Sequence, residues 1–441
     1  MKTIKIFLLP VILLGIVSCD TNEPPPPPDG EKPTLELTLE DASCTEAWIE
    51  LTTTNLQLPA TLTLKQFNPT GDTLSQVLNL STQDSLLYID SLLPNKTYTF
   101  LASHSGLSGI SSNELSVTTM DTTSHDFTFQ SWTFGTIGSS TLYDVAIINE
   151  NNIWAVGEIL VADTSQNGYT LYNAVHWDGN EWELKRIMFY TICGQQNQNA
   201  YPASSIFAFS VNDIWVGMQG SQIARLNDTT QIGTYCIPIS VRKLWGTDSQ
   251  NIYAVGINGQ IAHYNGQGWT QIESGTELDF HDIYGATDTK TGEQQILAVC
   301  TRNLPLDKGI YKIEGNTAVE ISSSPIQWEL YALWFIPNRH YYVIGNGIYE
   351  KKSLTDPAWK DNGFDITHYA TTGIRGTDLN DVFIAGAFGE FLHFNGISWK
   401  SYINETGWFS GSYGGIAVKN NLVVTVGYER AQAQILKGYR N

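Results

Sequence analysis

Short runs of alternating apolar and polar residues, separated by turn-forming residues, fill the stretch between residues 33 and 120. The turns contain Pro, Asn, Gly and Asp, as in 68–72 and 94–96, and these residues favour tight reversals. Because successive side chains of a β-strand point to opposite faces, this pattern predicts about seven short strands packed as a β-sandwich. The clearest runs are 34–39, 47–53, 60–67, 86–89, 97–104 and 114–119.

A second pattern recurs between residues 127 and 441. An Asn-Ile-aromatic-Ala-Val-Gly run is followed by a glycine, an Asn-Gly pair and a Trp, most clearly from Asn251 to Trp269. Units of about 40 residues are typical of the four-stranded blades of β-propellers. We expect seven blades, with six or eight left open because the fourth and fifth copies match weakly. In most copies an aromatic or apolar residue stands three before the strand-ending glycine, and aligning the copies on this residue places it at positions 154, 215, 253, 297, 342, 383 and 424.

The unit from 241 to 272 shows how one blade is built. We expect an inner strand at 241–245, a second strand at 252–256 that is apolar on both faces, and a third at 260–264. Asn265-Gly266 supplies the positive φ angles of a tight hairpin, and Trp269 opens the outer strand. The last unit has no fourth strand before the chain ends at residue 441. The alternating segment 127–134 is therefore predicted to supply the outer strand and close the ring.

The N-terminus has a basic start, an apolar run at 6–17 and then Cys19. This run is too short for a stable membrane span and is typical of a secretion signal. The segment 16–19 resembles the lipobox of bacterial lipoproteins, which implies cleavage before Cys19 and lipidation, including palmitate, of that residue; an ordinary signal peptide is the alternative. The acidic segment after Cys19 resembles the surface-export signal of Bacteroidota lipoproteins. Prolines 24–28 predict a stiff polyproline stalk.

The sandwich also carries a resemblance. Segment 92–100 resembles the tyrosine corner of fibronectin type III domains, and 109–119 resembles their last strand. The resemblance implies that the Tyr98 hydroxyl donates a hydrogen bond to the backbone upstream. The predicted organisation is thus a signal peptide (1–18), a lipidated Cys and stalk (19–32), a fibronectin type III-like β-sandwich (33–120) and a β-propeller (127–441), all of the all-β class.

The net charge excludes some classes of binding partner, and the cysteines leave one disulfide open. The formal net charge is −20, which argues against nucleic acid and against electrostatic docking on anionic lipid. Membrane association is expected through the lipid anchor alone. Cys193 and Cys236 could bridge neighbouring blades in an oxidising compartment, but unpaired buried thiols are slightly favoured.

No catalytic motif or metal-ligand spacing is present in the sequence, so we expect no catalytic residue, no metal and no cofactor. Three histidines, His176, His263 and His393, precede the hairpin at equivalent positions of three units. This repetition indicates a role in the repeat structure, because a single metal site would not recur from blade to blade.

Long insertions gather on one face of the predicted propeller, where the loops from the fourth strand to the next blade and from the second to the third strand meet; we name it the top face. The insertions are 158–173, 186–204, 361–372 and 404–413. Their aromatic and amide side chains suit sugar rings or a protein interface, unless the aromatics merely pack the loops down. The candidate ligand-binding residues are Tyr169, Tyr172, Tyr190, Tyr201, Phe364, Tyr369, Trp408, Phe409 and Tyr413.

We therefore expect a monomeric, non-enzymatic binding or scaffold lipoprotein of the outer membrane or cell surface. Its top face would bind a glycan or another cell-envelope protein. Two alternatives stay open: a polysaccharide-degrading propeller enzyme (hydrolase or lyase), and a structural subunit of an envelope assembly.

Overall fold

The computed structural model describes residues 32–303 and 306–441, so the predicted signal peptide and Cys19 lie outside the described residues. The chain divides into two compact units. The first unit consists of three segments, which are the described residues up to Thr38, Ile49–Leu87 and Thr99–Ser116. The second unit consists of Leu39–Trp48, Tyr88–Tyr98 and Val117–Asn441. Because these segments interleave, the bounds 33–120 and 127–441 stay a prediction.

Seven strands between residues 34 and 118 form two antiparallel sheets. One has the order β1-β2-β5, from β1 (Thr34–Ala42), β2 (Ala47–Thr54) and β5 (Asp84–Ile89). The other has the order β4-β3-β6-β7, from β3 (Ala60–Phe67), β4 (Thr73–Leu80), β6 (Thr97–His104) and β7 (Leu115–Thr118).

Two details of these sheets differ from the sequence analysis. Strand β4 lies outside the runs predicted from the sequence, because its apolar residues Leu74 and Val77 are 57% and 64% exposed and give no inward-facing alternation. The hydroxyl of Tyr98 accepts a hydrogen bond from the Leu93 backbone N–H at 2.8 Å. The predicted tyrosine-corner bond is therefore present with the opposite polarity, since the hydroxyl was expected to donate.

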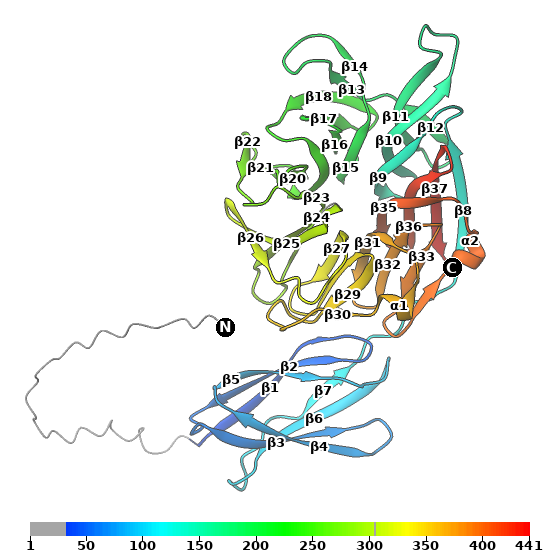
Figure 1. Cartoon of the computed structure of the whole chain (residues 1–441). Helices are drawn as coiled ribbons and strands as arrows, with labels where there is room; N and C mark the ends of the chain where they lie inside the picture. Colours follow the sequence, from blue (N-terminus) through cyan, green and yellow to red (C-terminus); the bar gives the residue numbers. More distant parts are fainter. Residues whose placement is uncertain (1–31, 304–305) are drawn as a thin grey trace, which may run out of the picture. The chain divides into compact units, whose positions relative to one another are not determined.

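The described part of 127–441 forms seven four-stranded antiparallel sheets, which we number first to seventh (Figure 1). The first is β9 (Thr141–Asn149), β10 (Asn152–Ala162), β11 (Tyr169–Trp177) and β12 (Trp182–Lys185). The second is β15 (Ala203–Ser210), β16 (Asp213–Met218), β17 (Gln222–Asn227) and β18 (Thr230–Cys236). The third is β19 (Val241–Asp248), β20 (Asn251–Gly256), β21 (Ile261–Tyr264) and β22 (Trp269–Ile272).

The fourth sheet is β23 (Asp279–Thr287), β24 (Gln294–Asn303), β25 (Leu306–Glu314) and β26 (Thr317–Ile321), and the fifth is β27 (Leu330–Ile336), β28 (His340–Gly345), β29 (Gly347–Lys351) and β30 (Lys360–Asp361). The sixth is β31 (Thr371–Asp378), β32 (Asp381–Gly386), β33 (Phe391–Phe394) and β34 (Trp399–Ser401). The seventh joins β35 (Gly411–Lys419), β36 (Leu422–Glu429) and β37 (Gln432–Arg440) to β8 (Phe127–Phe134).

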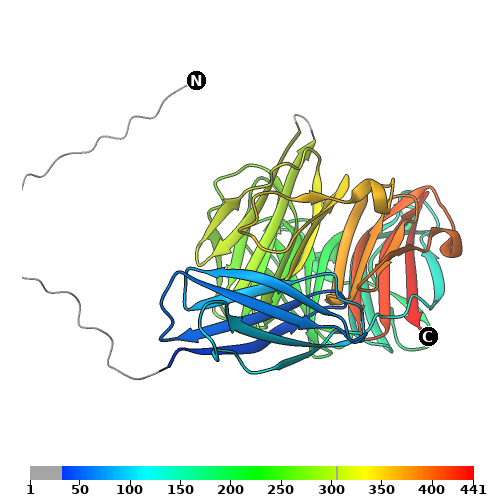
Figure 2. The ribbon, with the colours of Figure 1, turned by 90° about the horizontal axis from the view of Figure 1, so that it is seen from below.

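The sheets form a closed ring. The innermost strand of each sheet contacts that of the next, and β35 of the seventh contacts β9 of the first. Their second strands are almost wholly buried, as in β20 and β32, because both faces pack against neighbouring sheets. Apolar clusters accordingly join consecutive sheets; one links Trp215 of the second sheet to Ile252 of the third. Figure 2 views the same sheets after a 90° turn.

The ring is closed by the segment that the sequence predicted. Strand β8 pairs antiparallel with β37, with Trp132 opposite Ile435, and the two lie side by side in Figure 1. Trp132 packs into the apolar cluster between the seventh and first sheets. Tying the two ends of the repeat region into one sheet leaves no sheet edge open at the junction.

The insertions of the top face carry secondary structure of their own. Residues 158–173 are mostly a hairpin that lengthens β10 and β11, with Ala162 opposite Tyr169. Strands β13 (Met188–Tyr190) and β14 (Gln198–Ala200) pair within the second insertion, and helices α1 (Gly363–Ile366) and α2 (Ile403–Thr406) occupy the other two. No helix of the described residues is long and apolar enough to cross a membrane.

Candidate functional site

A cavity of about 610 Å³ opens where the seven inner strands begin. All seven, β9, β15, β19, β23, β27, β31 and β35, contribute lining residues near their starts. These strands begin after the loops of the top face, so the cavity lies at the top end of the ring axis. We call it the central cavity.

Small residues line one side of the central cavity. Ala332, Gly373 and Gly415 hold equivalent places in the fifth, sixth and seventh sheets, each opposite the second strand of its own sheet. A Cβ atom added at the neighbouring Gly414 would meet no atom within 4 Å, so the space directly beside it is free. The first four sheets instead place Asp144, Ser205, Lys243 and Asp282 at this level.

Two buried ion pairs connect the sheets below the cavity mouth. Lys243 Nζ lies 2.6 Å from Asp144 Oδ1, which joins the third sheet to the first. The Arg375 guanidinium bonds both oxygens of Asp282 at 2.8 Å, which joins the sixth sheet to the fourth. Burial alone would lower the pKa of Arg375, but the charge of Asp282 and its hydrogen bonds raise that pKa above its ordinary value. Each of the two aspartates thus lies in an ion pair that joins two sheets.

Each of these carboxylates also accepts a backbone bond from the sheet in between. The N–H of Ile206 in the second sheet donates to Asp144 at 2.9 Å. The N–H of Leu333 in the fifth sheet donates to Asp282 at 3.1 Å. Each aspartate therefore bonds to the two sheets that follow its own, so that it joins three consecutive sheets. Such a satisfied buried network makes the cavity floor rigid.

The mouth of the central cavity is aromatic and polar. Tyr143 and Tyr428 are 36% and 40% exposed and line it. Arg242, which pairs with Asp279 at 2.9 Å, lies between this cavity and a neighbouring one of about 810 Å³. His281, shared by both cavities, has its pKa lowered to about 4 by burial and by the nearby Arg242 charge, so its ring is neutral at pH 7.

The charged groups that line the central cavity are held in ion pairs. Among the described residues that line the central cavity, Asp282 is the single carboxylate, and Arg375 holds it in a bidentate pair. The described residues also contain no group of three or more His, Cys, Asp or Glu side chains placed to hold a metal ion.

The aromatic residues predicted on the first two insertions are spread over two hairpins. Tyr169 is 38% exposed at the end of the β10–β11 hairpin, while Tyr172 packs half-buried against the apolar cluster of the first and seventh sheets. Tyr201 packs against the cluster of the first and second sheets. Tyr190 ends β13, and its backbone is held by Gln222.

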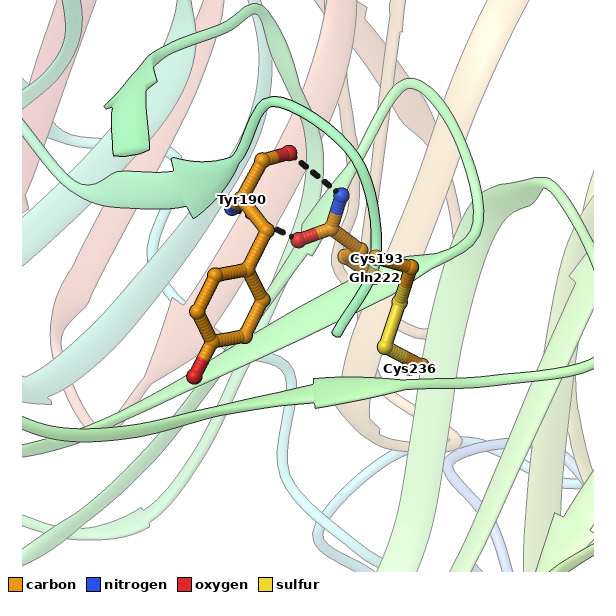
Figure 3. Close-up of a disulfide and its surroundings, with 4 residues drawn as sticks. All are labelled: Tyr190, Cys193, Gln222 and Cys236. Carbon is orange, nitrogen blue, oxygen red and sulfur yellow. Dashed lines mark hydrogen bonds between the residues drawn. A yellow bond between two sulfur atoms is a disulfide. The ribbon is translucent and has the colours of Figure 1, made fainter. Parts of the chain in front are cut away.

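The β13–β14 hairpin is fastened to the second sheet by a disulfide. Cys193 and Cys236 are bonded, with their Cα atoms 6.0 Å apart, so the expectation of unpaired thiols was wrong. Cys236 ends β18 of the second sheet, where the hairpin lies close enough for the bond. Beside it, the Gln222 side chain bonds the backbone N–H and C=O of Tyr190 at 2.8 Å each (Figure 3). Cys44 and Cys300 are buried free thiols.

The other predicted residues lie around the sixth sheet. Tyr369 and Trp408 come together through a residue that the sequence analysis did not select, Phe388 in the β32–β33 turn. Phe409 and Tyr413 are only 6% and 1% exposed and pack in the cluster between the sixth and seventh sheets. Burial makes them supports of these loops, although Tyr413 also contributes to the cavity lining. The side chain of Phe364 lies outside the described residues.

The three repeated histidines serve the sheets. His176, His263 and His393 each bond a side-chain oxygen of the second strand, in Asn152, Asn251 and Asp381, at 3.2, 2.7 and 3.0 Å. Each ring also stacks on the aromatic residue of that strand, with centroids 4.3 to 4.4 Å apart. The structural role predicted for them fits these contacts.

Tyr143, Tyr428 and Arg242 line the cavity but lie outside the long insertions, which is why they are absent from the predicted site. The repeat pattern still locates them, since Tyr143 and Arg242 lie near the starts of inner strands and Tyr428 lies near the end of the second strand β36. Phe388 could also have been found, since the alignment sets it opposite Asn258 of the third unit.

Comparisons with known proteins bear on the fold. No protein-family model matches this chain, and no curated protein matches its sequence. The structure of YCF48 bound to D1 peptide is similar with a TM-score of 0.51 at 15% identity, over 71% of this chain and 97% of that one. The WD40 β-propeller domain of Doa1 is similar with a TM-score of 0.46 at 11% identity, over 70% of this chain and 96% of that one. BamB from Moraxella catarrhalis is similar with a TM-score of 0.37 at 12% identity, over 70% of this chain and 97% of that one. The chain has a β-propeller fold.

Proposed function

We propose that this protein is a non-enzymatic binding module that holds a segment of a partner protein in its central cavity. The observation that carries the proposal is the open side of that cavity, where Gly414 leaves free space near the exposed rings of Tyr143 and Tyr428. Ligand sites are concave, partly apolar and supplied with a few placed polar groups. The central cavity has all three properties.

A polypeptide segment fits the lining better than a charged ligand does. The cations Lys243 and Arg375 are already paired with aspartates, so no strong uncompensated charge faces the cavity from them. The lining hydroxyls of Ser240, Thr372 and Ser412 can bond peptide groups. The similar structure of YCF48 was solved with a D1 peptide, which offers an example from another protein with this fold.

We further propose that the protein is lipid-anchored at Cys19 and faces an extracytoplasmic space. The N-terminal pattern supports the anchor, and the Cys193–Cys236 disulfide supports an oxidising compartment. The sheet orders β1-β2-β5 and β4-β3-β6-β7 support a fibronectin type III-like module. Each of the seven four-stranded sheets would be one blade of a seven-bladed propeller. Radiolabelled palmitate incorporation that is equal in wild type and Cys19→Ser would refute the anchor.

The cavity assignment can be tested by filling it. Gly414→Trp places a large side chain in the free space of the cavity, at a backbone conformation that any residue can adopt. Gly268→Trp is a matched control, since Gly268 also faces open space but lies in the hairpin before β22, away from the cavity lining. A photo-crosslinking amino acid in place of Tyr428, on intact cells, reports the partner.

We expect a discrete crosslinked protein in the wild type and in Gly268→Trp, and its loss in Gly414→Trp. An equal crosslink in all three proteins, with equal thermal stability, would contradict a partner in the cavity.

A further inference from the structure

Three aromatic rings cluster on the surface beside the sixth sheet, and we call this group the aromatic platform: Tyr369, Phe388 and Trp408. The rings of Phe388 and Trp408 are nearly parallel, 7° apart, with centroids separated by 5.5 Å. Tyr369 lies 5.6 Å from Phe388. Trp408 is 60% exposed and Phe388 is 41% exposed, so a large apolar surface faces water.

The backbone of Phe388 is unusual. Its φ is +58°, and Gly389 follows at +84°. A bulky residue with positive φ is a conformational outlier, because its Cβ crowds the backbone, and such strain clusters at functional sites.

The third sheet contains the same turn without the strain. Asn258 has a φ of +54° and Gly259 of +71°. The two turns share two hydrogen bonds. In the third sheet the Gly256 N–H donates to the Gln260 C=O at 2.9 Å, and the Gln260 N–H donates to the C=O of residue 257 at 3.1 Å. In the sixth sheet the Gly386 N–H donates to the Glu390 C=O at 2.9 Å, and the Glu390 N–H donates to the C=O of residue 387 at 3.1 Å. Asn tolerates this conformation far better than Phe does. The fold therefore does not require an aromatic residue at 388.

The turn is held firmly by the loop that carries Trp408. The Phe388 N–H donates to Gly411 C=O at 2.8 Å, and the Phe409 N–H donates to Phe388 C=O at 3.3 Å. The buried ring of Phe409 lies directly beneath Gly389, where a Cβ would come within 2.7 Å of it. Phe388 and Trp408 are thus fixed relative to each other before any ligand arrives.

We infer that the aromatic platform is a binding site for a neutral glycan. The flat faces of exposed rings match the apolar C–H face of a pyranose. Three rings offer a few hundred Å² at most, whereas a stable protein interface buries about 1,200 to 2,000 Å². The net charge of −20 disfavours acidic polysaccharides. This site is separate from the central cavity and does not depend on the function proposed for it.

The test measures the binding of the full-length protein, in detergent, to insoluble polysaccharides. The probes are cellulose, a β-1,3-glucan, mannan and xylan, with calcium alginate as the acidic comparison. The variants are Phe388→Asn, which installs the residue of the third-sheet turn, and Trp408→Ala. Trp328→Ala is the matched control, because Trp328 is 49% exposed and lies outside the platform.

We expect the wild type and Trp328→Ala to bind at least one neutral polysaccharide equally, and each platform variant to bind it at least tenfold more weakly. Thermal unfolding verifies that the variants are folded; should Phe388→Asn fail to fold, Trp408→Ala decides the outcome alone. Binding by the folded platform variants equal to wild type, binding to alginate only, or no binding to any neutral probe would each overturn the inference.

Discussion

The third and sixth sheets have the same strand pairing but different residues at the cavity and in the turn between the second and third strands. Their first and second strands pair in the same register, with Val241 opposite Gly256 and Thr371 opposite Gly386, and with irregularities at equivalent places. Each bridges its second and third strands through a histidine, and each sends a cation to an aspartate two sheets earlier in the ring.

The copies differ where the scaffold leaves a choice. The third sheet supplies its cation from Lys243, while the sixth has Gly373 at that place and supplies Arg375 two residues later. The third sheet turns on Asn258 and the sixth on Phe388. The two sheets therefore share their register and packing, whereas the residues that face the cavity or the top face differ between them.

The largest expected difference between the two sheets lies in their ion pairs. Arg375→Ala leaves Asp282 buried without its bidentate partner, and we expect a loss of about 3 to 5 kcal/mol in the free energy of unfolding. Lys243→Ala removes one bond from Asp144, which keeps the hydroxyl of Ser205 at 2.7 Å and the N–H of Ile206. We expect a loss of about 1 to 3 kcal/mol there.

Urea unfolding measures both losses. The double variant Asp282→Asn/Arg375→Leu is the control, because it leaves no unpaired buried charge and should be more stable than Arg375→Ala. A Lys243→Ala variant less stable than Arg375→Ala would contradict the prediction that the ion pair of the sixth sheet contributes more stability than that of the third.

A second prediction concerns pH. Burial lowers the pKa of His263, and burial also lowers that of His393, where the bond to Asp381 opposes the shift while Arg440 and Lys400 reinforce it. The unfolded chain takes up these protons below about pH 6.5, whereas the folded protein resists them. Stability contributed by the neutral rings is therefore present above pH 6.5 and is lost as the pH falls towards the lowered pKa values.

Urea unfolding at pH 7.5, 6.5 and 5.5 should show stability declining on acidification. His263→Gln and His393→Gln should each reduce the slope. A slope unchanged by both replacements would show that these histidines do not carry the effect.

The smallest expected effect comes from exchanging the two turn residues. Asn258→Phe should destabilise the protein by about 1 kcal/mol, since it imposes the strained conformation on a bulky residue. Phe388→Asn relieves that strain but loses stacking worth about 0.5 to 1.5 kcal/mol, so stability should stay level or rise slightly. Thermal unfolding of both variants, beside wild type, measures the pair. A Phe388→Asn variant that is clearly less stable would show that the fold itself needs the aromatic ring.

The sequence predicted the scaffold better than the site, for physical reasons. The closing strand β8 was found because the last unit visibly lacked a strand, and burial on both faces made β20 and its counterparts readable. Strand β4 escaped because its apolar residues face outward. The central cavity forms only where seven strand ends converge. Residues far apart in the chain, such as Tyr143 and Tyr428, could therefore be grouped only by comparing the repeat units, and not from their neighbours in the sequence. The partners of Cys193 and Phe388 were likewise set by how the loops fold back.

The measurement that tests the account most directly is the photo-crosslink at position 428 on intact cells, compared between Gly414→Trp and Phe388→Asn. Both variants alter the top face, but only the first fills the central cavity. We predict that the crosslinked partner is lost in Gly414→Trp and retained at wild-type level in Phe388→Asn. A partner retained in Gly414→Trp, or lost in Phe388→Asn alone, would contradict a protein-binding cavity that is distinct from the aromatic platform.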